Sequence, residues 1–373
     1  MEIKIVEVNS PSLLRTFIHL PAKIHSGHKN WVPPIYLDDR GFFNKKKNKS
    51  FLYSDTILLL AYKDDKPVGR IMGIINHRYN KASRDNDARF CFMETWNDAE
   101  VFHALLSFIE NWSRQKGVVN LVGPLGFSDK DPQGFLVEGF DEPVVLATNC
   151  SFPYMPELLR NEGYTKKVDC VVYKVPVPGD IPDFYKAIYQ RALRNNHIRI
   201  LEFTSRKDIK PLIRPVLTLL NETFADIYAF DPFEESEMDD FANRYLPLLD
   251  PKFIKMVTDP DGKIISFIIA MPDISKGIIA CKGRVIPIGI FQIIQARKKA
   301  KQLNLLMGGI SKEYRSRGLD VIMGVKMLET AHKYGLEYID SHLELETNVL
   351  VRKEMERMEG KVYKRFRVFK KEL

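Results

Sequence analysis

Residues 303–335 constrain the fold of this 373-residue chain more than any other stretch. They begin with a short apolar run that ends at Ile310. Runs of this length are typical of buried strands, although periodicity alone does not exclude a helix. A polar, basic loop follows, and apolar residues then recur at helical spacing as far as Gly335, which suits the left-handed position after a helix. The stretch therefore predicts a strand, a tight loop and a helix.

Such a junction directs free backbone N–H groups and the positive end of a helix dipole at one spot, which suits a phosphate or pyrophosphate. The loop consists of Arg315, Ser316, Arg317, Gly318, Leu319 and Asp320. It resembles the R-x-x-G-x-G/A loop with which the GNAT N-acetyltransferase superfamily holds the pyrophosphate of acyl-CoA. Asp320 departs from that pattern, because Gly or Ala is usual there, and a carboxylate repels a diphosphate unless it caps the helix and turns away. A strand, loop and helix without a ligand is the alternative interpretation.

The resemblance continues to the end of the chain. Residues 348–360, which open with Asn348, resemble the N-x-x-A…G helix that follows in GNAT proteins, and residues 361–371 resemble their last strand. The basic, Tyr-rich ending is similar to that of one branch of large, mostly uncharacterised bacterial GNAT-like proteins. The resemblance implies an α/β (α+β) fold, with a mixed and mostly antiparallel sheet flanked by helices, and acetyl-CoA or another acyl-CoA as co-substrate.

The first half of the chain echoes the second. Residues 149–175 repeat the order seen from Asn348 onward: an Asn, a short helix, a Gly and a strand rich in Lys and Tyr. We interpret this as a duplication of one α/β unit, with a period too long for a solenoid. The proline-rich segment 176–182 is the natural linker, so we predict GNAT-like domains at residues 1–178 and 179–373.

The two copies differ at the loop. The first has no R-x-x-G-x-G/A pattern between Glu94 and Ala99, where Asn97 or Asp98 instead suits a helix cap. We therefore expect the first domain to have lost acyl-CoA binding and to serve as a scaffold or as a wall of the substrate site.

Composition sets wider bounds. The net charge of +8 and pI near 9.0 favour anionic partners such as acyl-CoA, nucleotides, RNA or a membrane surface, but do not choose among them. The four cysteines lie far apart without metal-ligand spacing, so we expect no metal and a reducing, cytoplasmic setting. The longest apolar stretch, residues 285–294, is short and broken by Pro287, so no transmembrane segment is expected.

Acyl transfer needs a polarised carbonyl. By resemblance to GNAT enzymes, in which a splayed strand leaves amides unpaired, N–H groups near Gly308, Gly309 and Ile310 are expected to do this. One such donor is worth about 2.7–4 kcal/mol. Two glycines in a strand also suit a bulge or a close approach by another side chain, which is the alternative.

The transfer also needs a base and an acid. His342, Glu344 and Glu346 are spaced by two along a predicted strand, residues 337–346, so we expect them on one face beside the cleft. Glu346 is the predicted base and His342 the second choice. The alternative is that the two glutamates are solvated or salt-bridged.

The acid is less well defined. Many GNAT enzymes carry a Tyr seven residues after the motif Asn, but Met355 stands there in this chain. Tyr314 and Tyr363 are the nearest substitutes.

Three functions follow from these observations. The first is an enzyme, an acyl-CoA-dependent N-acyltransferase that acts on a small-molecule or peptide amine. The second is an aminoacyl-tRNA-dependent transferase on a paired GNAT fold, since nucleic acid is not otherwise expected but tRNA suits the basic charge. The third is a non-catalytic binding protein. The basic segment 276–302 exceeds what a GNAT connector needs and predicts a lid, an oligomer contact such as a homodimer, or an extra helix.

Overall fold

The computed structural model describes residues 2–373, except for the side chains of residues 195 and 196. The strands of the first half are β1 (Ile3–Glu7), β2 (Ser54–Lys63), β3 (Lys66–Asn76), β4 (Asp87–Thr95), β5 (Asn120–Gly123), β6 (Phe135–Glu138) and β7 (Thr165–Pro176). Its helices are α1 (Pro11–His19), α2 (Pro21–Ile24), α3 (Tyr36–Phe42), α4 (His77–Ser83), α5 (Ala99–Gln115) and α6 (Tyr154–Asn161).

The second half repeats this plan. Its strands are β8 (Arg199–Glu202), β9 (Ile254–Thr258), β10 (Ile264–Pro272), β11 (Gln302–Ile310), β12 (Tyr338–Asp340), β13 (Glu344–Leu345) and β14 (Lys361–Glu372). Its helices are α7 (Asp183–Asn196), α8 (Arg206–Ile209), α9 (Ile213–Phe224), α10 (Glu235–Tyr245), α11 (Ser275–Ala280), α12 (Ile290–Lys298), α13 (Leu319–Lys333) and α14 (Val349–Arg357).

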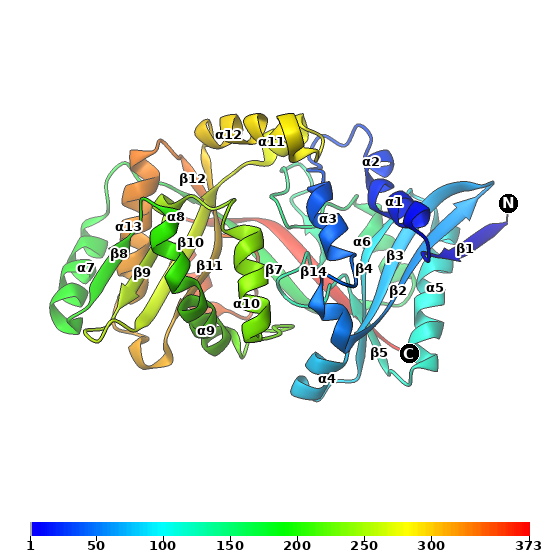
Figure 1. Ribbon diagram of the computed structural model, residues 1–373, viewed down its shortest axis with the longest axis horizontal. Coiled ribbons are helices and arrows are strands. Elements are labelled where there is room, and N and C mark those ends of the chain that lie inside the picture. Colours follow the sequence, from blue (N-terminus) through cyan, green and yellow to red (C-terminus); the bar gives the residue numbers. More distant parts are fainter. Residues whose placement is uncertain (1) are drawn as a thin grey trace.

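The strands form one sheet in the order β1-β2-β3-β4-β5-β14-β7-β12-β11-β10-β9-β8, which runs through both lobes in Figure 1. Each half contains one parallel pair, β4 with β5 and β11 with β12, and the other pairs are antiparallel. The expected mixed, mostly antiparallel sheet is confirmed, and the matching order of elements supports the predicted duplication.

The two halves exchange their last strands. β14, which closes the second half in sequence, pairs with β5 of the first half, and β7, which closes the first, pairs with β12 of the second. β14 and β7 also pair with each other along most of their lengths. The sheet therefore has no break at residue 178, and the division into two sequence domains at that point stays a prediction.

Helices cover both faces of each half. In the first, α5 and α6 bury residues such as Phe102 and Leu159 against one face, while α1 to α3 pack Phe17 and Phe42 on the other. In the second, α9 and α10 cover one face, and α13 covers the opposite one. Segment 276–302 forms α11 and α12, which bridge the tops of the two lobes in Figure 1.

The predicted strand 337–346 is wrong, because the structure breaks it in the middle. β12 ends at Asp340, His342 takes a left-handed φ of 58°, and only Glu344 and Leu345 resume as β13. The Asp340 carboxylate accepts a hydrogen bond from the His342 backbone N–H at 2.7 Å, which stabilises this bend. β13 then pairs with β7 and not with β11. His342, Glu344 and Glu346 consequently do not share a strand face through a spacing of two.

Candidate active site

The loop before α13 has the backbone of an anion site. Gly318 is the N-cap of α13 with a φ of 82°, and Ser316 is also left-handed at 60°. Among the described residues, no side chain caps this helix, and the backbone N–H groups of Leu319, Asp320 and Val321 have no hydrogen-bond partner. Free amides at a helix N-terminus, together with the helix dipole, favour a bound anion.

The side chains around the loop are mostly basic. The Arg315 Nε lies 3.5 Å from the Ile310 carbonyl oxygen, and the Arg317 guanidinium lies over the Tyr314 ring at 4.9 Å. Asp320 is exposed in the first turn and does not cap the helix. One carboxylate therefore stands beside the free amides and opposes a bound diphosphate.

The strand before the loop opens on one side. β11 pairs with β12 only from Gln302 to Asn304. On that side of β11, residues 305–310 have no strand partner in the part of the chain that the structure describes. A bulge at Leu306, opposite Ile269 and Ala270 of β10, marks where the opening begins. This is the splayed arrangement that the resemblance predicts.

Only some of the expected amides face the opening. The Ser311 N–H donates to the Ile265 carbonyl oxygen at 2.8 Å, so the backbone N–H of Ser311 faces β10. Backbone groups alternate along an antiparallel pair, so the Gly309 N–H also faces β10, while those of Gly308 and Ile310 face the open side.

Glu346, the predicted base, is held in an ion pair. Its carboxylate lies 2.7 Å from the Lys166 Nζ and accepts a hydrogen bond from the Asp169 backbone N–H at 3.1 Å. Both partners belong to β7. This arrangement matches the salt-bridged alternative, and a catalytic role for Glu346 stays a prediction.

Glu344 has a pKa suited to proton transfer. Burial raises the pKa of its carboxyl to about 8, opposed by a contact of 3.5 Å from the Asn348 side-chain amide. A carboxyl with a pKa close to neutral pH can accept or release a proton during a reaction. Asn348, the motif residue, is thus adjacent to a titratable group.

The other two candidates are engaged in the fold. Burial lowers the pKa of the His342 imidazole, which Asp340 and the backbone of Leu146 in the first half partly oppose. The Tyr363 hydroxyl donates to Asp340, and burial together with that carboxylate raises the pKa of this phenol. Tyr314, beside the loop, is therefore the better placed of the two predicted acids.

The corresponding helix of the first half, α5, is capped by a side chain. The Asp98 carboxylate caps α5 by accepting hydrogen bonds from the backbone N–H groups of Glu100 and Val101 at 3.1 and 3.2 Å. A carboxylate thus occupies the place where an anion would bind. The loss of acyl-CoA binding in the first copy stays a prediction.

The first half instead contains a polar cavity that the sequence interpretation missed. It has a volume of about 30 Å³, and its lining includes His25, Glu94 and Cys150. Glu94 lies near the end of β4, the strand that corresponds to β11 in the duplication, and Cys150 lies at the start of the repeated Asn segment. Those two positions were the only sequence indications of the site, because His25 is far from both in the chain.

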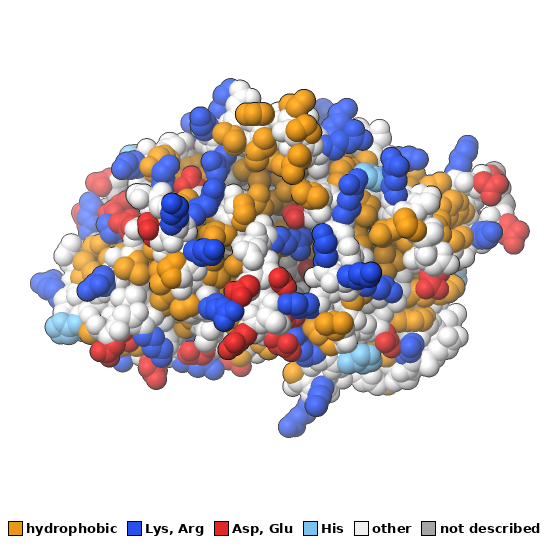
Figure 2. All heavy atoms as spheres, viewed as in Figure 1, with side chains coloured by type: hydrophobic (Ala, Val, Ile, Leu, Met, Phe, Trp, Pro, Cys, Tyr) orange, Lys and Arg blue, Asp and Glu red, His pale blue; other side chains and the backbone are white. Residues whose placement is uncertain are grey.

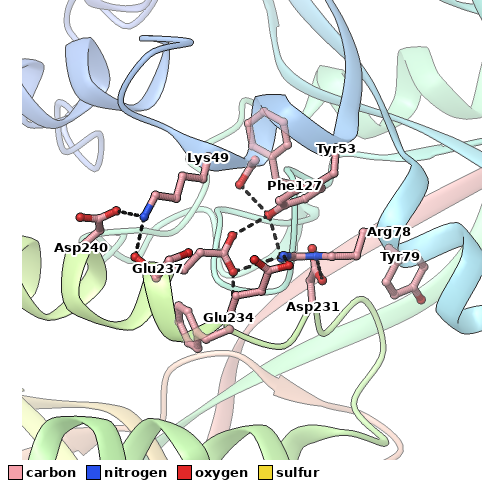
Figure 3. Close-up of polar contacts among 12 residues, drawn as sticks. Lys49, Tyr53, Arg78, Tyr79, Phe127, Asp231, Glu234, Glu237 and Asp240 are labelled. Atoms are coloured by element: carbon pink, nitrogen blue, oxygen red, sulfur yellow. Dashed lines mark hydrogen bonds and ion pairs between the residues drawn. The ribbon is translucent and has the colours of Figure 1, made fainter.

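A polar network joins the first half to residues 231–240 of the second half. Figure 3 shows Arg78 of α4 between Tyr53 and Asp231, with its Nε 2.8 Å from the Asp231 carboxylate and its guanidinium 3.7 Å from the Tyr53 ring. Lys49 pairs with Asp240 of α10 at 2.7 Å. The network fixes the segment before α10 against the first half.

Comparison with known proteins supports this architecture. No protein-family model matches the chain. It is 26% identical over 379 residues to a bacterial ceramide synthase of Caulobacter vibrioides, covering 100% of this chain and 98% of that protein. It is 22% identical over 367 residues to Protein YghO of Escherichia coli, covering 96% of this chain and 93% of that protein.

Solved structures give the same fold. A tandem GNAT protein from the clavulanic acid biosynthesis pathway superimposes with a TM-score of 0.57 at 11% identity, over 100% of this chain and 98% of the other. A GNAT-type N-acetyltransferase from Sphaerobacter thermophilus gives a TM-score of 0.51 at 12% identity, over 99% and 95%. The chain has the tandem GNAT fold, as the resemblance implied. Within the described residues, no helix is long and apolar enough to cross a membrane.

Proposed function

We propose that this protein is an N-acyltransferase that takes an acyl group from acyl-CoA, with the donor bound by the second half. One observation carries the proposal: three backbone amides at the start of α13, without a partner among the described residues, follow a strand that has parted from its neighbour. The capped α5 of the first half offers no such place for a diphosphate.

The reaction then assigns a task to each group. The thioester carbonyl oxygen accepts hydrogen bonds from the N–H groups of Gly308 and Ile310. The acceptor nitrogen bonds to the carbonyl carbon, its proton passes to Glu344, and the carbon–sulfur bond breaks. The CoA thiolate leaves and is protonated by the Tyr314 hydroxyl or by water.

For the acceptor we propose a long-chain amine of the kind found in lipids. The support is the full-length relative that is named a bacterial ceramide synthase, since a ceramide is the amide of a long-chain amino alcohol.

The donor is tested first, by thermal unfolding with acetyl-CoA, a long-chain acyl-CoA or free CoA. At a hundredfold excess over Kd, binding stabilises the folded state by about 2.7 kcal/mol. Ser316→Glu places a second carboxylate beside the free amides and should remove the shift. Ser12→Glu, at an exposed Ser near the start of α1, is the matched control and should keep it. Absence of any shift with all three ligands contradicts the proposal.

The acceptor is tested with the donor that binds best. Formation of an amide on sphinganine, but not on a short amine such as ethanolamine, is the expected result. Transfer to the short amine alone would retain the acyltransferase proposal and remove the lipid acceptor.

A further inference from the structure

The segment that bridges the two lobes exposes large apolar side chains. η4 (Val285–Gly289) joins α11 to α12. The exposed residues are Ile279 (40%), Ile286 (71%), Ile288 (71%), Ile290 (39%) and Phe291 (69%). Figure 2 shows the apolar side chains gathered at the top of the molecule, where Figure 1 places α11 and α12. Contiguous exposed apolar surface on a folded protein marks an interaction site.

The other side of this segment is packed, so the exposed face is presented by a fixed structure. Ile278 and Ile293 are buried together with Ile35 of the first half and Met271 of the second. A side chain at Gly277 would lie 2.7 Å from the Ile293 Cα, which shows how closely α11 and α12 approach. The apolar face is therefore not an unfolded loop.

The charges of the segment are all of one sign. Residues 274–301 contain no Asp or Glu and seven basic residues: Lys276, Lys282, Arg284, Arg297, Lys298, Lys299 and Lys301. Lys and Arg side chains lie on both sides of the apolar face in Figure 2. An apolar tip with basic flanks is the pattern with which proteins lie on membranes, because headgroups pair with the cations while the apolar side chains enter the acyl region.

We propose that this face docks the protein on the surface of an anionic membrane, with Ile286, Ile288 and Phe291 inserted below the headgroups. A second copy of the chain is a poorer occupant, because two such faces would bring their cations together without a carboxylate from either segment. A membrane supplies both the negative charge and the apolar interior.

The face is also connected to the candidate site. Its buried side packs against Leu306, the bulge residue of β11, and against Leu146 of the first half. If the proposed function holds, a lipid acceptor reaches the opening in β11 from the membrane side. Docking itself does not depend on that function.

Sedimentation of the full-length protein with vesicles tests the docking. We expect binding to vesicles of phosphatidylcholine with phosphatidylglycerol, weaker binding to phosphatidylcholine alone, and a decrease with salt. The double variant Ile288→Ser and Phe291→Ser should weaken binding at least about tenfold. Leu52→Ser removes a side chain that is 80% exposed on the first half and should change nothing.

Three results would overturn this inference: no vesicle binding, equal loss in the Leu52 variant, or a concentration-dependent dimer that the double variant abolishes. The thermal shift with acyl-CoA should persist in the double variant, so that failure of docking and failure of the proposed function can be told apart.

A second inference stands on a different cluster, in the cavity of the first half. His25 and His28 place their Nδ1 atoms 3.0 Å apart, and the Cys150 Sγ lies 3.9 Å from the His28 Nδ1. The three ligand atoms all lie within 4.8 Å of one another. In tetrahedral zinc sites, bonds of 2.0–2.1 Å to nitrogen and 2.3 Å to sulfur give edges of about 3.3 and 3.6 Å.

The surroundings suit a metal site as well. The Glu94 carboxylate lies 3.5 Å from the His25 Nε2, the nitrogen that faces away from His28, and a carboxylate on that nitrogen orients metal-bound histidines. The Phe152 ring is near parallel to both imidazoles, 4.9 and 4.4 Å from their centres. The adjoining cavity of about 30 Å³ is large enough for a water molecule.

We infer that His25, His28 and Cys150 bind a zinc-class divalent cation, whose fourth position faces the cavity. The prediction of no metal was based on the spacing of the cysteines alone. The competing arrangement is a proton shared between the two Nδ1 atoms without a metal.

Metal analysis of the full-length protein, after incubation with zinc and desalting, distinguishes a bound metal from a shared proton. We expect one zinc per chain, a thiolate-to-cobalt absorption band on cobalt substitution, and loss of both in Cys150→Ser. Cys281→Ser, at a half-buried cysteine of the other half, is the control and should keep both. Absence of bound metal and of the cobalt band, or equal metal in the Cys150 variant, refutes the site.

Discussion

At the scale of single residues, Asp320 is the side chain most opposed to the proposed donor. It stands in the first turn of α13, exposed, next to three free amides. Removing its charge in Asp320→Asn should tighten binding of CoA about two- to fivefold, because a charge at a helix N-terminus is worth about 0.3–1 kcal/mol. Isothermal calorimetry measures this change. Asp65→Asn, in the exposed β2–β3 turn, changes the net charge equally and should leave the affinity as it was.

Glu344 should make stability and activity depend on pH. Its pKa is raised from 4.5 to about 8, so between these values the folded state holds a proton that the unfolded state has released. The free energy of unfolding should therefore fall as the pH rises from about 4.5 to 8, by about 2–4 kcal/mol from this group.

Glu344→Gln should remove this decrease, which denaturant unfolding at several pH values measures. If Glu344 also accepts the amine proton, kcat/KM should rise with pH through a midpoint near 8 in the parent protein and level off above that pH, and this rise should vanish in the variant. An unchanged pH dependence of stability in Glu344→Gln would show that the carboxyl titrates normally.

At the scale of elements, the sequence predicted those elements that depend on residues close together in the chain. The strand, loop and helix of residues 303–335 were recognisable because apolar spacing, a basic loop and Gly318 lie next to one another, and the structure places them as expected. The break at His342 was not recognisable, because it depends on the Asp340 carboxylate, which also receives the hydroxyl of Tyr363 from a distant strand. The cluster of His25 with Cys150 is equally non-local.

Two glycines of one helix test the geometry of the loop. Gly318 has a φ of 82°, and a Cβ there would lie 3.0 Å from the Ala192 Cβ of α7, so Gly318→Ala should destabilise the protein by about 1–2 kcal/mol and weaken CoA binding. Gly324 lies inside α13, and a Cβ added there would meet no neighbouring atom within 4 Å, so Gly324→Ala should stabilise by about 0.8–1 kcal/mol. Opposite signs of the two changes in thermal unfolding are expected. A neutral Gly318→Ala would mean that the loop relaxes.

At the scale of the whole molecule, the network around Arg78 is one of the links between the halves. Asp231 is only 2% exposed, so Arg78→Ala would leave its carboxylate buried without its cation and should cost about 3 kcal/mol. Arg214→Ala breaks an exposed pair with Asp239 and should cost less than about 1 kcal/mol. Chemical denaturation of both variants gives the comparison. Equal losses would indicate that the network is a surface feature only.

The exchange of last strands predicts how each half behaves when it is expressed alone. Without residues 179–373, the first half lacks β14, which lies between β5 and β7, so the two remaining strands have no partner between them. Unpaired strand edges in a buried position cannot satisfy their backbone groups, and each fragment should therefore be unfolded or aggregated alone. Co-expression of residues 1–178 with 179–373 should restore a 1:1 complex with a cooperative unfolding transition, seen by size-exclusion chromatography and circular dichroism. A folded, monomeric fragment 1–178 would instead show that β7 can move beside β5, and that the exchange follows from the linkage of the halves and not from the stability of either one.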